Sequence, residues 1–220
     1  MRTTNRKYSA LIILLTSVCL SSFSQTFDLQ KLVIESKLIT YGRSLTLLND
    51  SKKGAISSKG VVWIKGLNFT NGTIEIDLRG KDIPQQSFLG IAFHGVDTIT
   101  YDAVYFRPFN FQAKDSVRKI HAVQYVSEPE YPWHRLREEK NGVYEKVISP
   151  PPSPTEWFHA RIVVKGSTIT VYVNNSTTPS LAVDKINSRK EGLIGLWSFG
   201  LNGELFTYTV IVDPLTTMRA

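Results

Sequence analysis

Residues 88–107 read FLGIAFHGVDTITYDAVYFR and contain two runs of alternating side chains, 88–94 and 101–107. Successive side chains of an extended strand point to opposite faces, so alternation with a period of two predicts β-strands. The larger apolar members of each run share one face: Leu89, Ile91 and Phe93 in the first, Val104 and Phe106 in the second. Each run therefore predicts a strand with one face in the core.

The same short, β-rich pattern recurs along the chain, with turn residues between the runs. The further runs are 61–64, 73–78, 121–127, 158–165, 168–173, 193–198 and 205–212. The Asn71-Gly72 pair predicts a hairpin turn between the first two of them. Because no apolar stripe with a period of 3.6 extends over a dozen positions, we expect helix only in turns. The pattern predicts an all-β, antiparallel, two-sheet sandwich or jelly roll that forms a single domain.

The first 24 residues have the layout of a secretory signal peptide. Arg2, Arg6 and Lys7 precede an apolar run without acidic residues, which is too short to span a bilayer. Ser22 and Ser24 predict cleavage before Gln25 and a domain over 25–220; a lipid anchor on Cys19 is the weaker alternative, because Val18 stands where a small residue is usual. We expect export to the periplasm or the cell exterior of a bacterium.

Removal of this segment changes the charge and the cysteine count. The net charge of the whole chain is +7; without the three basic residues of the segment, 23 basic and 19 acidic side chains leave +4. The basic residues do not cluster as a nucleic-acid site requires, so we expect no nucleic-acid partner. The single Cys leaves with the segment, so core packing has to hold the domain together without disulfides.

The faces opposite the apolar ones combine small residues with aromatic and polar ones. Gly90 and Ala92 share such a face with His94, and Tyr105 with Arg107; Trp197 shares another with Gly195. Small residues leave room above a sheet, aromatic rings stack on sugar rings, and a guanidinium donates to paired oxygens. This composition favours a carbohydrate partner.

Two longer segments, 110–119 and 128–155, lack a strand pattern and predict functional or mobile loops. The second contains Trp133 and His134 among arginines and carboxylates, a composition that suits the rim or lid of a glycan site. The alternative interpretation, of nearly equal weight, is an exposed charged loop in which Trp133 closes the edge of the core.

Three groups of segments resemble the concanavalin A-like lectin and glucanase superfamily, and within it the laminin-G-like and 3-keto-disaccharide hydrolase-like domains. They are residues 71–78, residues 89–93 with 101–108, and the closing segments 157–166, 171–174 and 192–197. The resemblance implies a jelly roll of two curved sheets that meets its ligand on the concave face or at the loop rim. One fold hosts many activities, so it implies less about function.

Catalytic and metal motifs are weak. Glu75 and Asp77 resemble the E-x-D-x-x-E strand of family 16 glycoside hydrolases, but Gly80 replaces the third acid, so we interpret both as a solvated strand face. The four histidines lack zinc-ligand spacing, and we expect no cofactor. The resemblance leaves a structural calcium ion open.

Our first interpretation is an exported carbohydrate-binding domain, and the alternative is a glycan hydrolase of the 3-keto-disaccharide type that uses the same concave face. A structural interaction domain is a third reading. The expected contacts are His94, Tyr105, Arg107, Gln124, Trp133, His134 and Trp197. A histidine and a carboxylate that meet at an open pocket would favour the enzyme, whereas an aromatic platform alone would favour binding.

Overall fold

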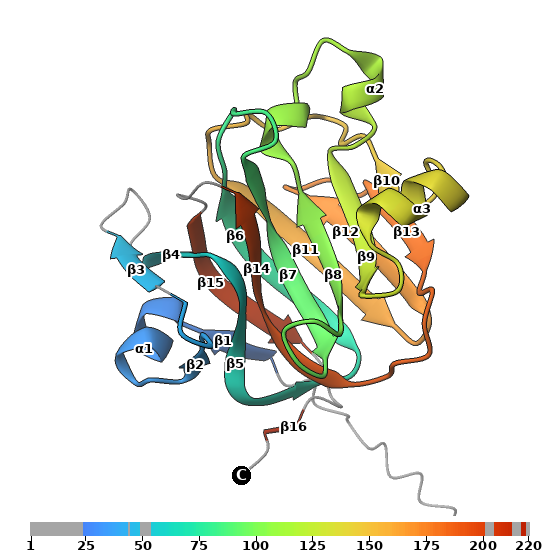
Figure 1. The fold of residues 1–220 in the computed structure, drawn as a ribbon. Coiled ribbons are helices and arrows are strands. Elements are labelled where there is room, and N and C mark those ends of the chain that lie inside the picture. The colour runs from blue at the N-terminus through green and yellow to red at the C-terminus, as the bar shows by residue number, and fades with distance from the viewer. Residues whose placement is uncertain (1–23, 44, 49–53, 201–204, 213–216, 219–220) are drawn as a thin grey trace, which may run out of the picture.

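Two antiparallel sheets lie face to face in the computed structural model, which describes residues 24–43, 45–48, 54–200, 205–212 and 217–218 (Figure 1). Neighbouring strands within each sheet are antiparallel throughout these ranges. The predicted all-β jelly-roll sandwich is confirmed.

The first sheet has the strand order β13-β12-β11-β6-β15-β4-β3, and β1 also pairs with β15. Its strands are β1 (Ser24–Phe27), β3 (Leu45–Leu48), β4 (Ala55–Ser58), β6 (Gly72–Arg79), β11 (Phe158–Lys165), β12 (Thr168–Val173), β13 (Leu181–Asp184) and β15 (Leu205–Val212). We call it the back sheet.

The second sheet has the order β10-β9-β8-β7-β14-β5-β16, and β2 also pairs with β5. Its strands are β2 (Leu38–Ile39), β5 (Gly60–Phe69), β7 (Ser87–Gly95), β8 (Tyr101–Phe106), β9 (Val123–Glu128), β10 (Glu145–Lys146), β14 (Gly192–Gly200) and β16 (Thr217–Met218). We call it the front sheet.

The core fills the space between the sheets, as the alternation predicts. The apolar faces of β6, β7 and β8 are buried there: Ile74, Ile76, Leu78, Leu89, Ile91, Phe93, Val104 and Phe106 are each at most 1% exposed. Phe106 of the front sheet packs edge-on against Phe158 of the back sheet, with ring centroids 5.2 Å apart. Each such side chain contributes about 1.5–3 kcal/mol by leaving water.

The predicted hairpin at Asn71-Gly72 is wrong. β5 pairs with β14 in the front sheet, whereas β6 pairs with β11 and β15 in the back sheet. The dipeptide therefore carries the chain from one sheet to the other, and the Asn71 side chain accepts a hydrogen bond from the Gly166 backbone N–H at 2.6 Å. The alternation of apolar and polar side chains reports only which face of a strand is buried. It therefore does not identify the strand with which that strand pairs.

Short helices also depart from the prediction of turns only. They are α1 (Leu29–Ile34), α2 (Ser116–Lys119), α3 (Trp133–Glu139) and the 3-10 turn η1 (Pro108–Asn110). α3 lies inside a segment predicted as loop; it buries only Leu136 and therefore has no apolar stripe to recognise. No helix of the described ranges is long and apolar enough to cross a membrane.

The predicted signal peptide lies outside the described residues, apart from Ser24, which begins β1. Cleavage before Gln25 therefore stays a prediction.

Candidate functional site

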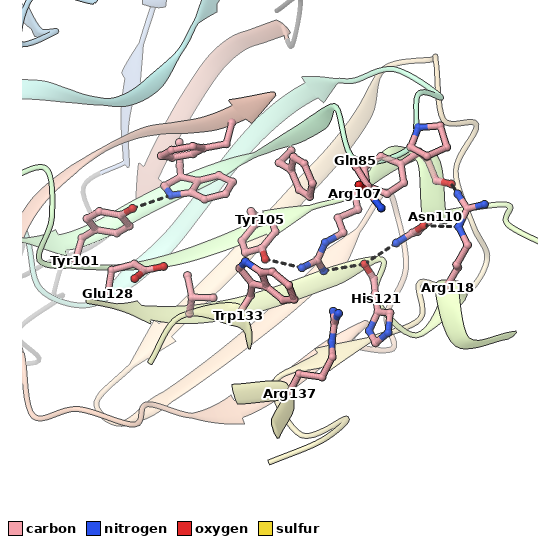
Figure 2. A pocket seen from close by; sticks show the side chains of 16 residues that line it. Gln85, Tyr101, Tyr105, Arg107, Asn110, Arg118, His121, Glu128, Trp133 and Arg137 are labelled. Carbon is pink, nitrogen blue, oxygen red and sulfur yellow. Dashed lines mark hydrogen bonds between the residues drawn. The ribbon is translucent and has the colours of Figure 1, made fainter. Parts of the chain in front are cut away.

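A pocket of about 700 Å³ opens on the front-sheet face that points away from the core (Figure 2). Its strand residues alternate with the core residues of the same strands, while η1, α2 and α3 supply the rim. The lining residues are Pro84, Gln85, Phe88, Tyr101, Tyr105, Arg107, Phe109, Asn110, Arg118, His121, Val126, Glu128, Trp133, Arg137, Trp197 and Phe199.

A single row of paired residues crosses the front sheet beneath this pocket. Strand register aligns, in order, Trp197, Gly90, Tyr105, Gln124 and Glu145 on β14, β7, β8, β9 and β10. Residues directly opposite each other on neighbouring strands share a face. The row therefore places two aromatic rings, an amide and a carboxylate side by side.

Gly90 lets the two aromatic rings of the row meet. Tyr105 and Trp197 stack above it, with ring centroids 4.4 Å apart and planes inclined by 26°. A Cβ at Gly90 would lie 2.0 Å from the Val104 carbonyl oxygen and 2.6 Å from the Tyr105 Cα, so the strands would have to shift. The Phe199 ring lies 4.7 Å from the Trp197 ring. We call Tyr105, Trp197 and Phe199 the aromatic floor.

Arg107 follows β8 directly and is held in one position beside the floor. Its guanidinium donates to the Tyr105 hydroxyl at 2.6 Å, to the His121 carbonyl oxygen at 3.0 Å and to the Gln124 side-chain oxygen. Only 5% of Arg107 is exposed, and burial lowers its pKa, although a guanidinium stays charged in proteins. Burial also raises the pKa of Tyr105 to about 12, so its hydroxyl stays protonated.

His121 meets a buried carboxylate at the wall of the pocket. Its Nδ1 lies 2.6 Å from Glu145 Oε2, which is close enough for an ion pair when the ring is protonated. The ring is not aligned for a linear hydrogen bond to this oxygen. Glu145 is 2% exposed and accepts two hydrogen bonds from Arg137, at 2.9 and 2.7 Å. Since Glu145 occupies the Nδ1 side of the ring, Nε2 is the nitrogen that can exchange a proton in the pocket.

Burial and charge set the protonation of this pair. Burial lowers the pKa of His121 below its ordinary value; Glu145 opposes this effect, and Arg137 adds to it. Burial alone would raise the pKa of Glu145, but the hydrogen bond and charge of Arg137 outweigh it, so the pKa is lowered. Near neutral pH the pair is therefore a neutral imidazole beside a carboxylate.

The opposite end of the pocket is formed where β8 begins and β9 ends. Trp197 Nε1 donates to the Tyr101 hydroxyl at 3.2 Å, and Glu128 lies opposite Tyr101 in the strand register. Burial raises the pKa of Glu128. The pocket thus carries a carboxyl group at one end and arginines at the other.

Comparison with known proteins identifies the family. Residues 28–206 match the model of the 3-keto-alpha-glucoside-1,2-lyase-like domain. The chain belongs to this family. The match confirms the 3-keto-disaccharide hydrolase-like resemblance, while a search of curated proteins found no match.

Solved structures similar to this 3-keto-alpha-glucoside-1,2-lyase-like domain share its fold at low identity. A Bacillus subtilis protein of unknown function with a galectin-like fold is 12% identical (TM-score 0.57; 89% of this chain and 96% of that one). A protein described as a putative glycosyl hydrolase from Parabacteroides distasonis is 14% identical (TM-score 0.53; 86% and 98%). A native glycosidic hydrolase is also 14% identical (TM-score 0.50; 90% and 98%).

Seven residues were expected to contact a sugar. Four of them line the pocket of this lyase-like domain: Tyr105, Arg107, Trp133 and Trp197. Gln124 lies behind the wall and is fully buried; it accepts hydrogen bonds from the Tyr105 hydroxyl and from Arg107. His134 is exposed on α3, does not line the pocket and packs its ring edge-on against Trp133.

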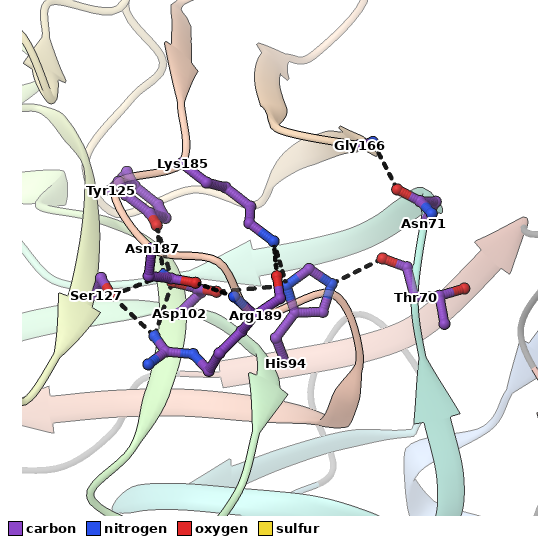
Figure 3. A network of polar contacts seen from close by, with 10 residues as sticks. All are labelled: Thr70, Asn71, His94, Asp102, Tyr125, Ser127, Gly166, Lys185, Asn187 and Arg189. Atoms are coloured by element: carbon purple, nitrogen blue, oxygen red, sulfur yellow. Dashed lines mark hydrogen bonds and ion pairs between the residues drawn. The ribbon is translucent and has the colours of Figure 1, made fainter.

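His94 does not lie where alternation places it. Its φ of +49° interrupts the extended backbone, and the fully buried ring turns into a separate polar network (Figure 3). There its Nε2 contacts the Thr70 carbonyl oxygen at 2.7 Å, and its Nδ1 lies 3.3 Å from Asp102 and 3.2 Å from Lys185. His94 therefore does not line the pocket in which it was expected to contact a sugar.

Glu75 and Asp77 belong to the back sheet and do not line the pocket. Both are partly exposed and face His159 on the neighbouring strand β11, with Asp77 2.8 Å from the His159 Nδ1. This placement agrees with the interpretation as a solvated strand face.

Several pocket residues of this family member were not singled out from the sequence. Arg118 and Arg137 line the pocket, and Glu145 lies behind its wall in contact with Arg137 and His121. All three stand in the segments 110–119 and 128–155 predicted as loops, but no local pattern distinguishes them, because their role depends on contacts that only the folded chain makes. In the described part of the chain, no three His, Cys, Asp or Glu side chains gather as a metal ion requires.

Proposed function

We propose that this protein is a carbohydrate-active enzyme that binds a glycoside in the front-sheet pocket and cleaves it by base-assisted elimination. The observation that carries the proposal is the His121–Glu145 pair at the wall of an open pocket, beside the aromatic floor. Membership of the 3-keto-alpha-glucoside-1,2-lyase-like family supports elimination over hydrolysis, which was the alternative interpretation of the sequence.

The aromatic floor suits a sugar ring. The faces of Tyr105 and Trp197 stack on each other, and the Arg107 guanidinium carbon lies over the Tyr105 ring, 4.8 Å from its centroid. C–H groups of a pyranose pack on such faces, while its hydroxyl groups exchange hydrogen bonds with the guanidinium. A volume of about 700 Å³ lies in the range of small-molecule sites.

The chemistry we propose needs a ketone at C3 of the sugar. That carbonyl acidifies the proton on C2, which His121 Nε2 removes as a general base. The electron pair forms the C1–C2 double bond, the C1–O glycosidic bond breaks, and the departing oxygen takes up a proton. Arg107 and Arg137 flank His121 and would stabilise the negative charge that develops on the C3 oxygen.

The test is turnover of a 3-keto-α-glucoside by the full chain, followed through the absorbance of the conjugated enone product. A positioned base typically contributes 10²- to 10⁴-fold, so we expect His121→Ala to lower kcat by at least about 100-fold. His134→Ala, an exposed histidine outside the pocket, is the matched control and should stay within about twofold. Equal activity of His121→Ala and the wild type would overturn the assignment.

The second candidate is the exported glycan-binding module first expected from the sequence, and the aromatic floor favours it. It predicts that unmodified glycosides bind but that no 3-keto-glucoside is consumed. Binding of an unmodified glycoside, without turnover of the 3-keto-glucoside, would favour this binding module over the enzyme.

A further inference from the structure

The end of the pocket where β8 finishes is rich in positive charge. We call Arg107, Arg118, Arg137 and His121 the arginine end; all four line the pocket. Figure 2 shows Arg118 and Asn110 at this end and Tyr101 with Glu128 at the other. The side chains belong to separate segments, which hydrogen bonds join at one point.

The hydrogen bonds that connect these segments meet at the backbone carbonyl oxygen of His121. It accepts from Arg107 at 3.0 Å and from the Asn110 side chain at 3.3 Å. Asn110 in turn accepts from Arg118 Nε at 3.3 Å, and the Phe109 carbonyl accepts from Arg118 at 2.9 Å. The network therefore fixes Arg118 relative to Arg107, and both guanidinium groups face the same space.

The charges at this end do not balance. Glu145 is fully engaged by Arg137 and His121, and its nearer oxygen is 3.8 Å from Arg107 Nη1. The closer partners of Arg107 are neutral: a hydroxyl, an amide and a carbonyl. Within the described residues, Arg118 forms no ion pair with a carboxylate and binds only neutral oxygens. Three guanidinium groups thus face one carboxylate.

A buried guanidinium without a matching anion is costly, because water no longer solvates the charge. Arg107 is only 5% exposed, and even its contact with Glu145 is shared with Arg137 and His121. A ligand oxyanion between Arg107 and Arg118 would offset this cost. Guanidinium groups bind carboxylate and sulfate groups through paired, charge-assisted hydrogen bonds.

We infer that the pocket selects acidic sugars: the arginine end binds an anionic substituent, a uronic acid carboxylate or a sulfate ester, on a glycoside whose ring lies on the aromatic floor. Because it names the substrate class of the same pocket, this inference rests on the proposed function.

The test compares three ligands that differ only at C6: 4-nitrophenyl α-D-glucoside, the corresponding glucuronide and the glucoside 6-sulfate. None carries a 3-keto group, so titration of the full chain measures binding without elimination. We expect an anionic ligand to bind about tenfold or more tightly than the neutral glucoside, with a preference that weakens as salt is added. Which anion binds better identifies the substituent.

Arg118→Gln should remove most of this preference, and Arg118→Lys should keep part of it. Lys119→Gln is the matched control, since Lys119 is exposed on the same short helix and does not line the pocket. Thermal unfolding of each variant separates a lost contact from a lost fold.

Each outcome decides a different claim. Equal binding of all three ligands by the wild type would overturn the acidic-sugar inference and leave the proposed function standing. Preference for an anion without turnover of any 3-keto-glycoside would support the inference and overturn the enzyme. Failure of all three ligands to bind would overturn the acidic-sugar inference, while turnover of a 3-keto-glycoside would still decide the proposed function.

Discussion

The ring of Trp197 on β14 stacks on the ring of Tyr105 on β8 across the intervening strand β7, which contributes Gly90 at that point. Two side chains separated by 92 positions in the sequence thereby form one aromatic surface. The same row continues through Gln124 to Glu145, so the sugar platform and the carboxylate that supports His121 belong to one line of paired residues. The register of the front sheet therefore assembles the site.

Replacing the indole of this surface should weaken sugar binding. We expect Trp197→Leu to raise Kd for a bound glycoside about tenfold, because it removes a stacking partner and its buried area. Trp157→Leu, which changes a tryptophan outside the pocket, should leave Kd unchanged. Calorimetric titration of both variants measures this; unchanged affinity in Trp197→Leu would rule out the floor as the sugar platform.

Adding one methyl group at Gly90 should destabilise the fold. Because the Cβ would meet backbone atoms of β8, we expect Gly90→Ala to lower the free energy of unfolding by about 1–3 kcal/mol or more. Gly142→Ala is a useful comparison, since open space surrounds that position and only its φ of +68° opposes alanine. Urea denaturation should show the larger loss at Gly90; the reverse order would contradict the close approach of the strands.

Glu145 should make the fold sensitive to acid. Its pKa in the folded state lies below the ordinary value of 4.5, so its contribution to stability is complete above about pH 4.5 and is lost as the pH falls through the folded-state pKa. We expect Glu145→Gln to lose about 3–5 kcal/mol at pH 7, because Arg137 and Arg107 lose their charged partner. The difference from the wild type should narrow below pH 4.5; unfolding curves that stay parallel from pH 7 to pH 3 would argue against this pair.

The pH dependence of kcat/KM should report His121. A general base must be deprotonated, and burial lowers the pKa of His121 below 6.5, so activity should rise through a pKa below 6.5 and be level at pH 7. Since Glu145 holds this pKa up, Glu145→Gln should move the rise to lower pH. A rise centred above pH 7 would exclude His121 as the base.

The N-terminus can be tested directly. Expression with export in a bacterial host, followed by N-terminal sequencing, should give a chain that starts at Gln25. A start elsewhere, or a lipid on Cys19, would correct the predicted cleavage site.

The sequence was informative where an inference needed only one strand. Alternation placed Val104 and Phe106 in the core and Tyr105 and Arg107 on the pocket side, because successive side chains of a strand must face opposite ways. It failed at His94, where a left-handed backbone ended the alternation and turned the ring into a buried network.

The sequence by itself thus determined many of the strand segments, the two faces of most of these, and Tyr105, Arg107 and Trp197 as groups of the pocket. Only the tertiary structure decided that β5 and β6 belong to different sheets, and that Arg118, His121 and Glu145 gather around one space. The physical reason is the sequence separation of the interacting residues. Side-chain direction follows from the local backbone, whereas strand pairing and charge contacts depend on residues far apart in the chain.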